Sequence, residues 1–343
     1  MEKSAQEVVL TVSSSPHVRC NESIPKIMWT VVATLVPAAA FGVYYFGFNA
    51  LLNIIVSIVS AVFFEWAWEK FMHKKITIND GSAVITGLLL AMCCSPILPW
   101  WMCIVGSFIA IVVCKQAMGG LGYNLFNPAH VGRAGLMVSW PVAMTTWTQV
   151  NGSVIDGVAG ATPLNVLKQS GYDALLQLFN NDPMTMYQNM FLGFRNGSMG
   201  ETSTVLLILG GLFLMYKGYV KWQATVAMIA TVGILMWVFG GAVGAHATGG
   251  LFTGDPIFHM MAGGLIIGAF FMSTDMVTAP ITWKGQLIFA VGAGVLTVLI
   301  RLLGGYPEGV CYSILMNAVT PLIDLTVKPR IFGSVKVKAK EAE

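Results

Sequence analysis

Long runs of apolar residues place the strongest constraint on this chain. Stretches able to cross a hydrocarbon core of about 30 Å recur along it, separated by polar or Gly-rich breaks. With 56% hydrophobic and 10% charged residues, the chain is far from the roughly 25% charged residues of soluble domains. This composition excludes a soluble enzyme and a disordered chain. We therefore expect an all-α polytopic membrane protein.

The apolar runs predict ten transmembrane helices, five on each side of a polar break. The fifth is short and carries Arg133 and Pro141. The expected spans cover residues 27–45, 50–68, 82–98, 101–113, 130–143, 202–215, 224–241, 257–273, 286–302 and 310–325.

The same pattern divides the chain into five parts. We expect a cytoplasmic N-terminal segment (1–25), a first transmembrane half (26–144), one large extracytoplasmic loop (145–201), a second half (202–326) and a basic cytoplasmic tail (327–343). The first part has no apolar core followed by a small-residue cleavage site, so it does not resemble a signal peptide.

The positions of the basic residues predict the orientation. If the N-terminus is cytoplasmic, most of the 19 Lys and Arg residues fall on the inner side, as the positive-inside rule requires. Both termini should then face the cytoplasm, in the inner membrane of a bacterium-like cell. The inner residues are Lys3, Arg19, Lys26, Lys70, Lys74, Lys75, Lys115, Lys217, Lys221, Lys284, Lys328, Arg330, Lys336, Lys338 and Lys340.

The two halves resemble each other weakly. The string Gly87-Leu-Leu-Leu-Ala before Pro96 is similar to Gly264-Leu-Ile-Ile-Gly before Pro280. A Gly-Gly pair also precedes Asn127 in the first half and Asn317 in the second. Because five spans per half is an odd number, such a repeat would be inverted about the membrane plane. Chance similarity between apolar helices is the alternative.

Several catalytic motifs are absent from the sequence. It contains no phosphate-binding loop, no Cys-x-x-Cys and no His-Glu-x-x-His. We therefore expect no ATP hydrolysis, no cysteine-held iron–sulfur cluster, no metal site and no complete active site in this chain. Adjacent Cys93 and Cys94 are interpreted as small hydrophobic residues.

One polar string stands out in the large loop. It reads Asp156-Gly-Val-Ala-Gly-Ala-Thr-Pro-Leu164, with Thr162 flanked by very small side chains. These neighbours predict a sterically open hydroxyl, which another enzyme could modify because Thr needs an external base or metal to attack phosphorus. The alternative is that Thr162 is the N-cap of a helix over 163–167, with Pro163 at its first position.

The string Asp-Gly-x-x-Gly-Ala-Thr resembles the flavinylation motif of a membrane-protein family. The family comprises the D subunits of Rnf-type ion-translocating ferredoxin:NAD oxidoreductase complexes and the related B subunits of sodium-pumping NADH:quinone reductases. The resemblance implies that a flavin transferase, using FAD, esterifies the Thr162 hydroxyl to the phosphate of FMN. Asp156, Gly160 and Ala161 complete the matching site. Ala159 departs from the usual Ser or Thr.

Further similar segments occur in family order along nearly the whole chain. The short N-terminal extension and the string at 200–203 are more similar to the Rnf subunit than to the quinone-reductase subunit. The matching segments cover 15–17, 80–87, 122–129, 200–203 and 306–310.

The resemblance also implies cofactors and partners. A second, non-covalent riboflavin is implied by relatives, and the partners would be other Rnf subunits, lipid and the flavin transferase, without nucleic acid. Ferredoxin and nicotinamide chemistry would belong to those subunits. For the flavin ring, Gly119 and Gly120 could admit close approach, and Asn124 and Asn127 could supply amides.

Polar residues inside apolar spans are costly and are functional candidates by default. For Arg133 and Glu308 we consider equally a pair that pins the two halves and a role in transport. Two other functions stay open for the whole chain: a secondary transporter or channel without redox activity, and a passive assembly scaffold. The buried polar candidates are Asn127, His130, Arg133, Asp275, Glu308 and Asn317.

Overall fold

The computed structural model describes residues 22–148, 159–241, 250–305 and 308–329. Within these ranges one antiparallel strand pair, β1 (Trp147–Thr148) and β2 (Ala159–Gly160), accompanies the helices. The helices before β1 are α1 (Ile24–Phe46), α2 (Phe48–Phe71), η1 (Ile78–Asp80), α3 (Ser82–Cys93), α4 (Trp100–Phe108), the π-helical η2 (Ile109–Gln116), α5 (Pro128–Ser139) and α6 (Pro141–Thr145). Those after β2 are α7 (Pro163–Gln177), α8 (Pro183–Leu192), η3 (Met199–Glu201), α9 (Thr204–Tyr216), α10 (Trp222–Phe239), α11 (Pro256–Met261), α12 (Leu265–Ile267), the π-helical η4 (Gly268–Met272), α13 (Trp283–Leu303), α14 (Val310–Ile314), η5 (Leu315–Val319) and α15 (Thr320–Thr326).

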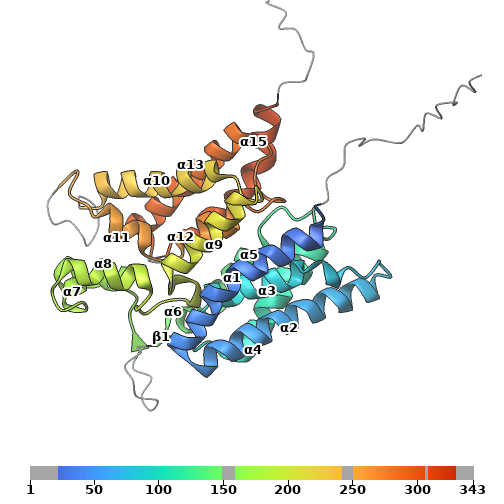
Figure 1. Cartoon of the computed structure of the whole chain (residues 1–343), viewed down its shortest axis with the longest axis horizontal. Helices are drawn as coiled ribbons and strands as arrows, with labels where there is room; N and C mark the ends of the chain where they lie inside the picture. The colour runs from blue at the N-terminus through green and yellow to red at the C-terminus, as the bar shows by residue number, and fades with distance from the viewer. Residues whose placement is uncertain (1–21, 149–158, 242–249, 306–307, 330–343) are drawn as a thin grey trace, which may run out of the picture.

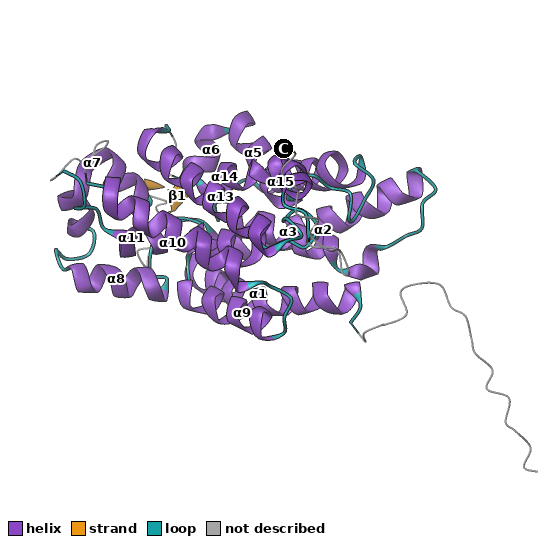
Figure 2. Cartoon of the chain, turned by 90° about the horizontal axis from the view of Figure 1, so that it is seen from above, coloured by secondary structure: helices purple, strands orange, loops and turns teal. Residues whose placement is uncertain are grey.

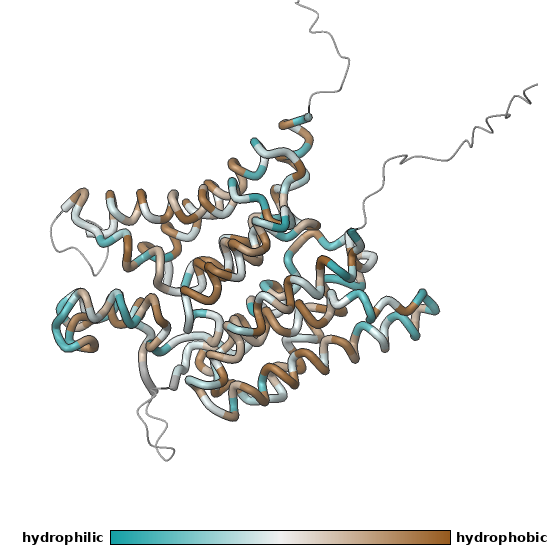
Figure 3. Tube along the Cα trace, in the orientation of Figure 1, coloured by the Kyte–Doolittle hydropathy of each residue, from teal (hydrophilic) through white to brown (hydrophobic). Residues whose placement is uncertain are grey.

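Four helices, α1, α2, α10 and α13, are long and apolar enough to cross a membrane. Figure 3 shows apolar residues concentrated along the helices, with polar residues mainly at their ends and in α7. Shorter apolar helices cover Ser82–Cys93, Trp100–Gln116, Thr204–Tyr216 and Val310–Thr326. The expectation of an all-helical polytopic membrane protein is confirmed, with several expected spans shorter than predicted.

The helices form two groups that pack on each other (Figure 1), and the view from above shows α9 over α1 (Figure 2). One group holds α1 to α5 and the other α9 to α15, and they meet where α1 packs on α9 and α5 packs on α14. Two pairs of helix contacts have counterparts in both groups. In the first pair, α2 packs on α4 and α10 packs on α13. Likewise, α5 packs on α4 as α14 packs on α13.

The described chain begins and ends at the same end of the helix bundle (Figure 1). We call this the terminal end, and the opposite end, where α7 and α8 lie, the loop end. The arrangement agrees with an even number of crossings between residue 22 and residue 329. It does not by itself assign either end to a side of the membrane.

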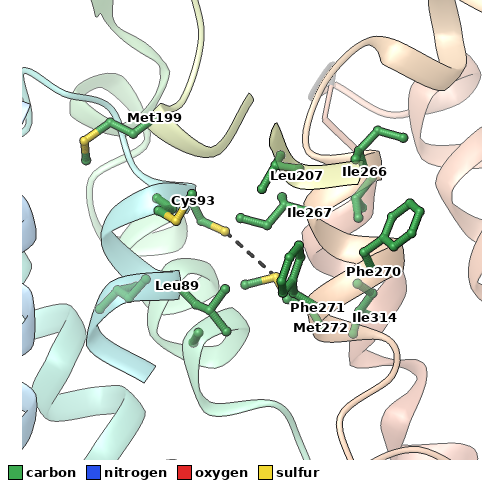
Figure 4. Close-up of a cluster of buried hydrophobic side chains, with 14 of the residues drawn as sticks. Leu89, Cys93, Met199, Leu207, Ile266, Ile267, Phe270, Phe271, Met272 and Ile314 are labelled. Carbon is green, nitrogen blue, oxygen red and sulfur yellow. Dashed lines mark hydrogen bonds between the residues drawn. The ribbon is translucent and has the colours of Figure 1, made fainter. Parts of the chain in front are cut away.

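The two groups share an apolar core. Cys93 of α3 faces Met272 of η4, with 4.0 Å between Sγ and Sδ, and Leu89, Leu207 and Phe271 surround them (Figure 4). Cys93 and Cys94 are free and buried, so their interpretation as small hydrophobic residues is confirmed.

Close helix packing inside the first group depends on Gly87 of α3. A Cβ atom there would lie 2.6 Å from the Ser57 carbonyl oxygen of α2. Small residues let helix backbones approach where lipid gives little hydrophobic drive for association.

The polar segment between the halves is folded rather than a plain loop. Helix α7 is kinked at Gly171, where φ is 84°, and α8 begins at the N-cap Asp182. Leu164 and Leu167 of α7, Met186 of α8 and Phe258 of α11 form a small second core. The helix expected over 163–167 is therefore correct at its start but continues to Gln177.

Candidate functional site

Thr162 is the N-cap of α7. Its backbone is extended, with φ −66° and ψ 152°, and its Oγ1 accepts a hydrogen bond from the Asn165 N–H at 3.2 Å. Pro163 occupies the first turn, where its missing N–H costs nothing. The N-cap interpretation of Thr162 is thus confirmed. A capping hydroxyl still carries its own hydrogen, so capping does not exclude modification.

The expectation of a sterically open Thr162 is wrong for the folded chain. Only 2% of the residue is exposed. The hydroxyl turns toward the first turn of α7 to cap it, while Leu164 two positions on packs into the second core. The small side chains next to Thr162 therefore allow the backbone to turn into α7, and they do not expose the hydroxyl to solvent.

The residues before Thr162 are held by the strand pair. Gly160 pairs with Trp147 and Ala159 with Thr148, and Ala161 is half-buried. Asp156, the first residue of the predicted motif, lies outside the described residues. The strand pair places Trp147 beside the backbone that leads into Thr162.

A cavity of 210 Å³ lies at the first turns of α7. We call it the Trp147 cavity. Its wall combines one aromatic ring, two amides and one carboxylate, which suits a planar heterocycle with hydrogen-bonding edges. It is lined by Met137, Thr145, Trp147, Asn165, Gln169, Gly305 and Glu308.

A second cavity at the loop end is larger, at 540 Å³. Tyr187 donates to Asp255 across it, at 2.6 Å. Its α7 residues are Leu167 and Tyr172, five or more positions beyond Thr162, or roughly 7 Å or more along a helix. The Trp147 cavity includes Asn165, whose backbone N–H bonds Thr162 directly, and is the nearer site.

Charged side chains form a buried cluster behind the Trp147 cavity. Arg133 donates to Glu308, so the predicted pair between the two halves is confirmed. Arg301 donates to the carbonyl oxygens of His259 at 2.7 Å and Ala262 at 2.8 Å. Arg195 donates to the carbonyl oxygens of Glu201 at 3.0 Å and Met261 at 2.6 Å.

Sequence reasoning missed most of this cluster. Arg195 and Arg301 are not among the buried polar candidates that the sequence indicates, yet each is at most 5% exposed. Glu201 lies in the string at 200–203, which was noted for its resemblance alone. The position of Glu201 between Gly200 and Thr202, at the start of an apolar run, was the one sequence feature that could have indicated a buried charge.

The other ring candidates lie at the terminal end. Asn124 and Asn127 line a cavity, here called the Asn127 cavity, together with Ser82, Lys115, Phe271 and Asp275. Asn127 also caps α5 by accepting from the Ala129 N–H at 3.1 Å. The structure does not bring these residues to Thr162.

Gly119 and Gly120 form the turn that follows η2. Both have positive φ values, 128° and 99°, so this turn requires glycine. Their backbone conformation accounts for them without a ligand.

The sequence placed Lys115 among the basic residues on the inner side of the membrane. In the structure Lys115 is buried and forms an ion pair. Its Nζ donates to Glu65 of α2 and to Ser82 of α3, each at 2.6 Å. Gln116 donates to the same Glu65 oxygen at 2.9 Å. Lys115 of the π-helical η2 thus contributes a charged side chain to the wall of the Asn127 cavity.

Within the described ranges no three His, Cys, Asp or Glu residues come together as a metal site.

Fold and buried polar sites together define a polytopic helical membrane protein with a polar segment folded at one end of the bundle. The family model described as "NQR2, RnfD, RnfE family" matches residues 11–333. The chain therefore belongs to this family.

Curated relatives match over nearly their full lengths. The D subunit of the proton-translocating ferredoxin:NAD(+) oxidoreductase complex of Clostridium ljungdahlii is 63% identical, over 95% of this chain and 97% of the relative. The D subunit of the Na(+)-translocating complex of Acetobacterium woodii is 43% identical, over 98% and 99%. The D subunit of the ion-translocating oxidoreductase complex of Stutzerimonas stutzeri is 38% identical, over 91% and 93%.

Proposed function

We propose that this chain is the D subunit of an Rnf-type complex that couples electron transfer between ferredoxin and NAD to ion translocation, and that it carries FMN on Thr162. One observation carries the flavin assignment. The hydroxyl that the motif identifies caps α7 directly beside the Trp147 cavity. The full-length similarity to D subunits supports the choice over the quinone-reductase B subunit.

The residues present fit a tethered FMN. A phosphate on Thr162 would lie at the N-terminus of α7, where the positive end of the helix dipole favours an anion. Trp147 offers a ring to stack on, and Asn165 and Gln169 offer amides to hydrogen-bond a flavin edge. When bound, the flavin supplies one-electron carrier chemistry that no side chain here provides. The covalent bond would replace a dinucleotide-binding fold.

The burial of Thr162 has a consequence for modification. A transferase cannot reach the hydroxyl of a residue that is only 2% exposed. Flavin attachment therefore precedes the packing of the first turn of α7, or requires that turn to open.

For the second, non-covalent flavin implied by relatives, we propose the Asn127 cavity. Apolar side chains such as Phe271 and the amides of Asn124 and Asn127 line it, and Lys115 adds a buried donor.

For the topology we propose ten crossings in two inverted halves, with the loop end outside the cytoplasm. The corresponding packing of α2 on α4 and α10 on α13 supports the repeat, as does the common end of both termini (Figure 1).

A reporter enzyme inserted in the 173–181 region, at the exposed turn of Asn180 and Asn181, tests this orientation. The reporter should be active only outside the cytoplasm. The same reporter at exposed Lys74, at the terminal end, should be active only inside. The reverse pattern contradicts the orientation, and the same side for both contradicts the crossing number.

Flavin fluorescence in a denaturing gel separates the proposed function from its rivals. The chain co-expressed with a flavin transferase should give a fluorescent band, because a covalent bond survives detergent. A secondary transporter, a channel or a passive scaffold predicts a dark band under the same conditions. Protein expressed without the transferase is the control and should be dark.

A further inference from the structure

One face of α5 is polar although it is buried against the second half. His130 and Arg133 are 2% and 3% exposed, and their three-residue spacing places them on the same side of the helix. That side meets α14 and the residues before it. Arg133 binds Glu308, and the Cys311 Sγ lies 3.7 Å from the His130 carbonyl oxygen.

Polar atoms along this contact lack protein partners. Both ring nitrogens of His130 and the Nε of Arg133 are buried without a hydrogen bond to any described residue. The Glu308 carboxyl group also faces the Glu201 carboxyl group. Buried polar groups in proteins almost always find a partner, and where the protein supplies none it is ordered water. We therefore expect a short chain of water molecules between α5 and α14.

The contact between α5 and α14 lies between two cavities, one toward the terminal end of the bundle and one toward the loop end. Asn127, Pro128 and Ala129 line the Asn127 cavity, and Met137 and Glu308 line the Trp147 cavity. Met137 lies ten positions along α5 from its N-cap Asn127, which is about 15 Å at 1.5 Å per residue. This is half of the roughly 30 Å hydrocarbon core, and His130 and Arg133 lie within it.

We propose that the contact between α5 and the Glu308–α14 segment is a proton pathway that links the two cavities through His130 and Glu308. The proposal rests on the proposed function, and it names the residues through which this subunit would conduct. One ring nitrogen of His130 binds a proton from the Asn127 cavity while the other releases one, through water, toward the Glu308 carboxylate. One proton moves and no other bond changes.

The chemistry of the contact favours a proton over a sodium ion. An imidazole and a carboxylate exchange protons through water, whereas a metal cation gives up its hydration shell only to a set of oxygen ligands. Arg133 holds the Glu308 carboxylate in place, and we assign it as a positioning residue.

The test uses the whole complex in vesicles, supplied with reduced ferredoxin and NAD. Proton movement is followed with a pH-sensitive dye and electron transfer by NADH formation. His130→Gln keeps hydrogen-bonding groups but does not exchange protons near neutral pH. It should lower the protons moved per NADH at least about tenfold, while NADH formation with a protonophore present stays at the wild-type rate.

Asn317→Ala is the matched control, because Asn317 is equally buried at 1% exposure and its amide also lacks a described partner. This variant should keep the wild-type proton yield. A second replacement, His130→Asn, guards against a packing effect of glutamine. The pathway is refuted if either His130 variant retains the wild-type proton yield, or if the wild-type complex moves sodium and no protons. A wild-type chain without flavin, or a complex that forms no NADH, instead refutes the proposed function.

Discussion

Replacement of Thr162 by asparagine is expected to remove the flavin from the chain and to stop ferredoxin-driven NADH formation by the assembled complex. A short tether gives a local flavin concentration of about 1 mM, and without it the Trp147 cavity would have to bind flavin from free solution. The measurement is flavin bound per complex together with the rate of NADH formation.

Asparagine is chosen because it separates the two roles of Thr162. It is a good N-cap and can replace the hydrogen bond to the Asn165 N–H, whereas alanine would also cost about 0.5–2 kcal/mol of capping. Thr162→Ser keeps both the cap and a hydroxyl and should retain flavin. Normal electron transfer in Thr162→Asn would show that a flavin on this residue is not needed.

Replacement of Arg133 by methionine is expected to destabilise the protein strongly. It leaves the Glu308 carboxylate, which is 8% exposed, buried without its ion-pair partner, and such losses cost about 3–5 kcal/mol. Because the two residues come from different halves, the halves should separate more easily. The free energy of unfolding of the purified chain in detergent measures the effect.

The double variant Arg133→Met/Glu308→Met is the control for this prediction. Apolar replacement of a whole buried pair is often neutral or stabilising, so most of the lost stability should return. A cost below about 1 kcal/mol for the single variant, which is the range of an exposed pair, would mean that the contact does not hold the halves together.

The apolar pattern predicts the long spans well, because membrane length and backbone hydrogen bonding together demand helices. Helices α1, α2, α10 and α13 lie where the hydropathy places them. The shorter segments are less predictable. The sequence pattern does not show that α4 continues as the π-helical η2, or that α11 and η4 are separate pieces on either side of Gly264.

The candidate site was predictable only where the signal is local. The capping role of Thr162 follows from Thr-Pro at a helix start. The partners of Arg133 and Lys115 lie 175 and 50 residues away, so only tertiary packing brings them together. The sequence allowed an ion pair between Arg133 and Glu308 as one of two interpretations. It did not predict the ion pair between Lys115 and Glu65, because a lysine at the end of a span normally extends its amine to water.

The mass of the tryptic peptide that ends at Lys168 and contains residues 150–168 tests the central claim most directly. It should be taken from the native complex, or from the chain co-expressed with a flavin transferase. A flavin on Thr162 predicts a mass gain of one FMN residue, with the fragment ions assigning it to that threonine. An unmodified peptide from cells that contain the transferase would contradict the account.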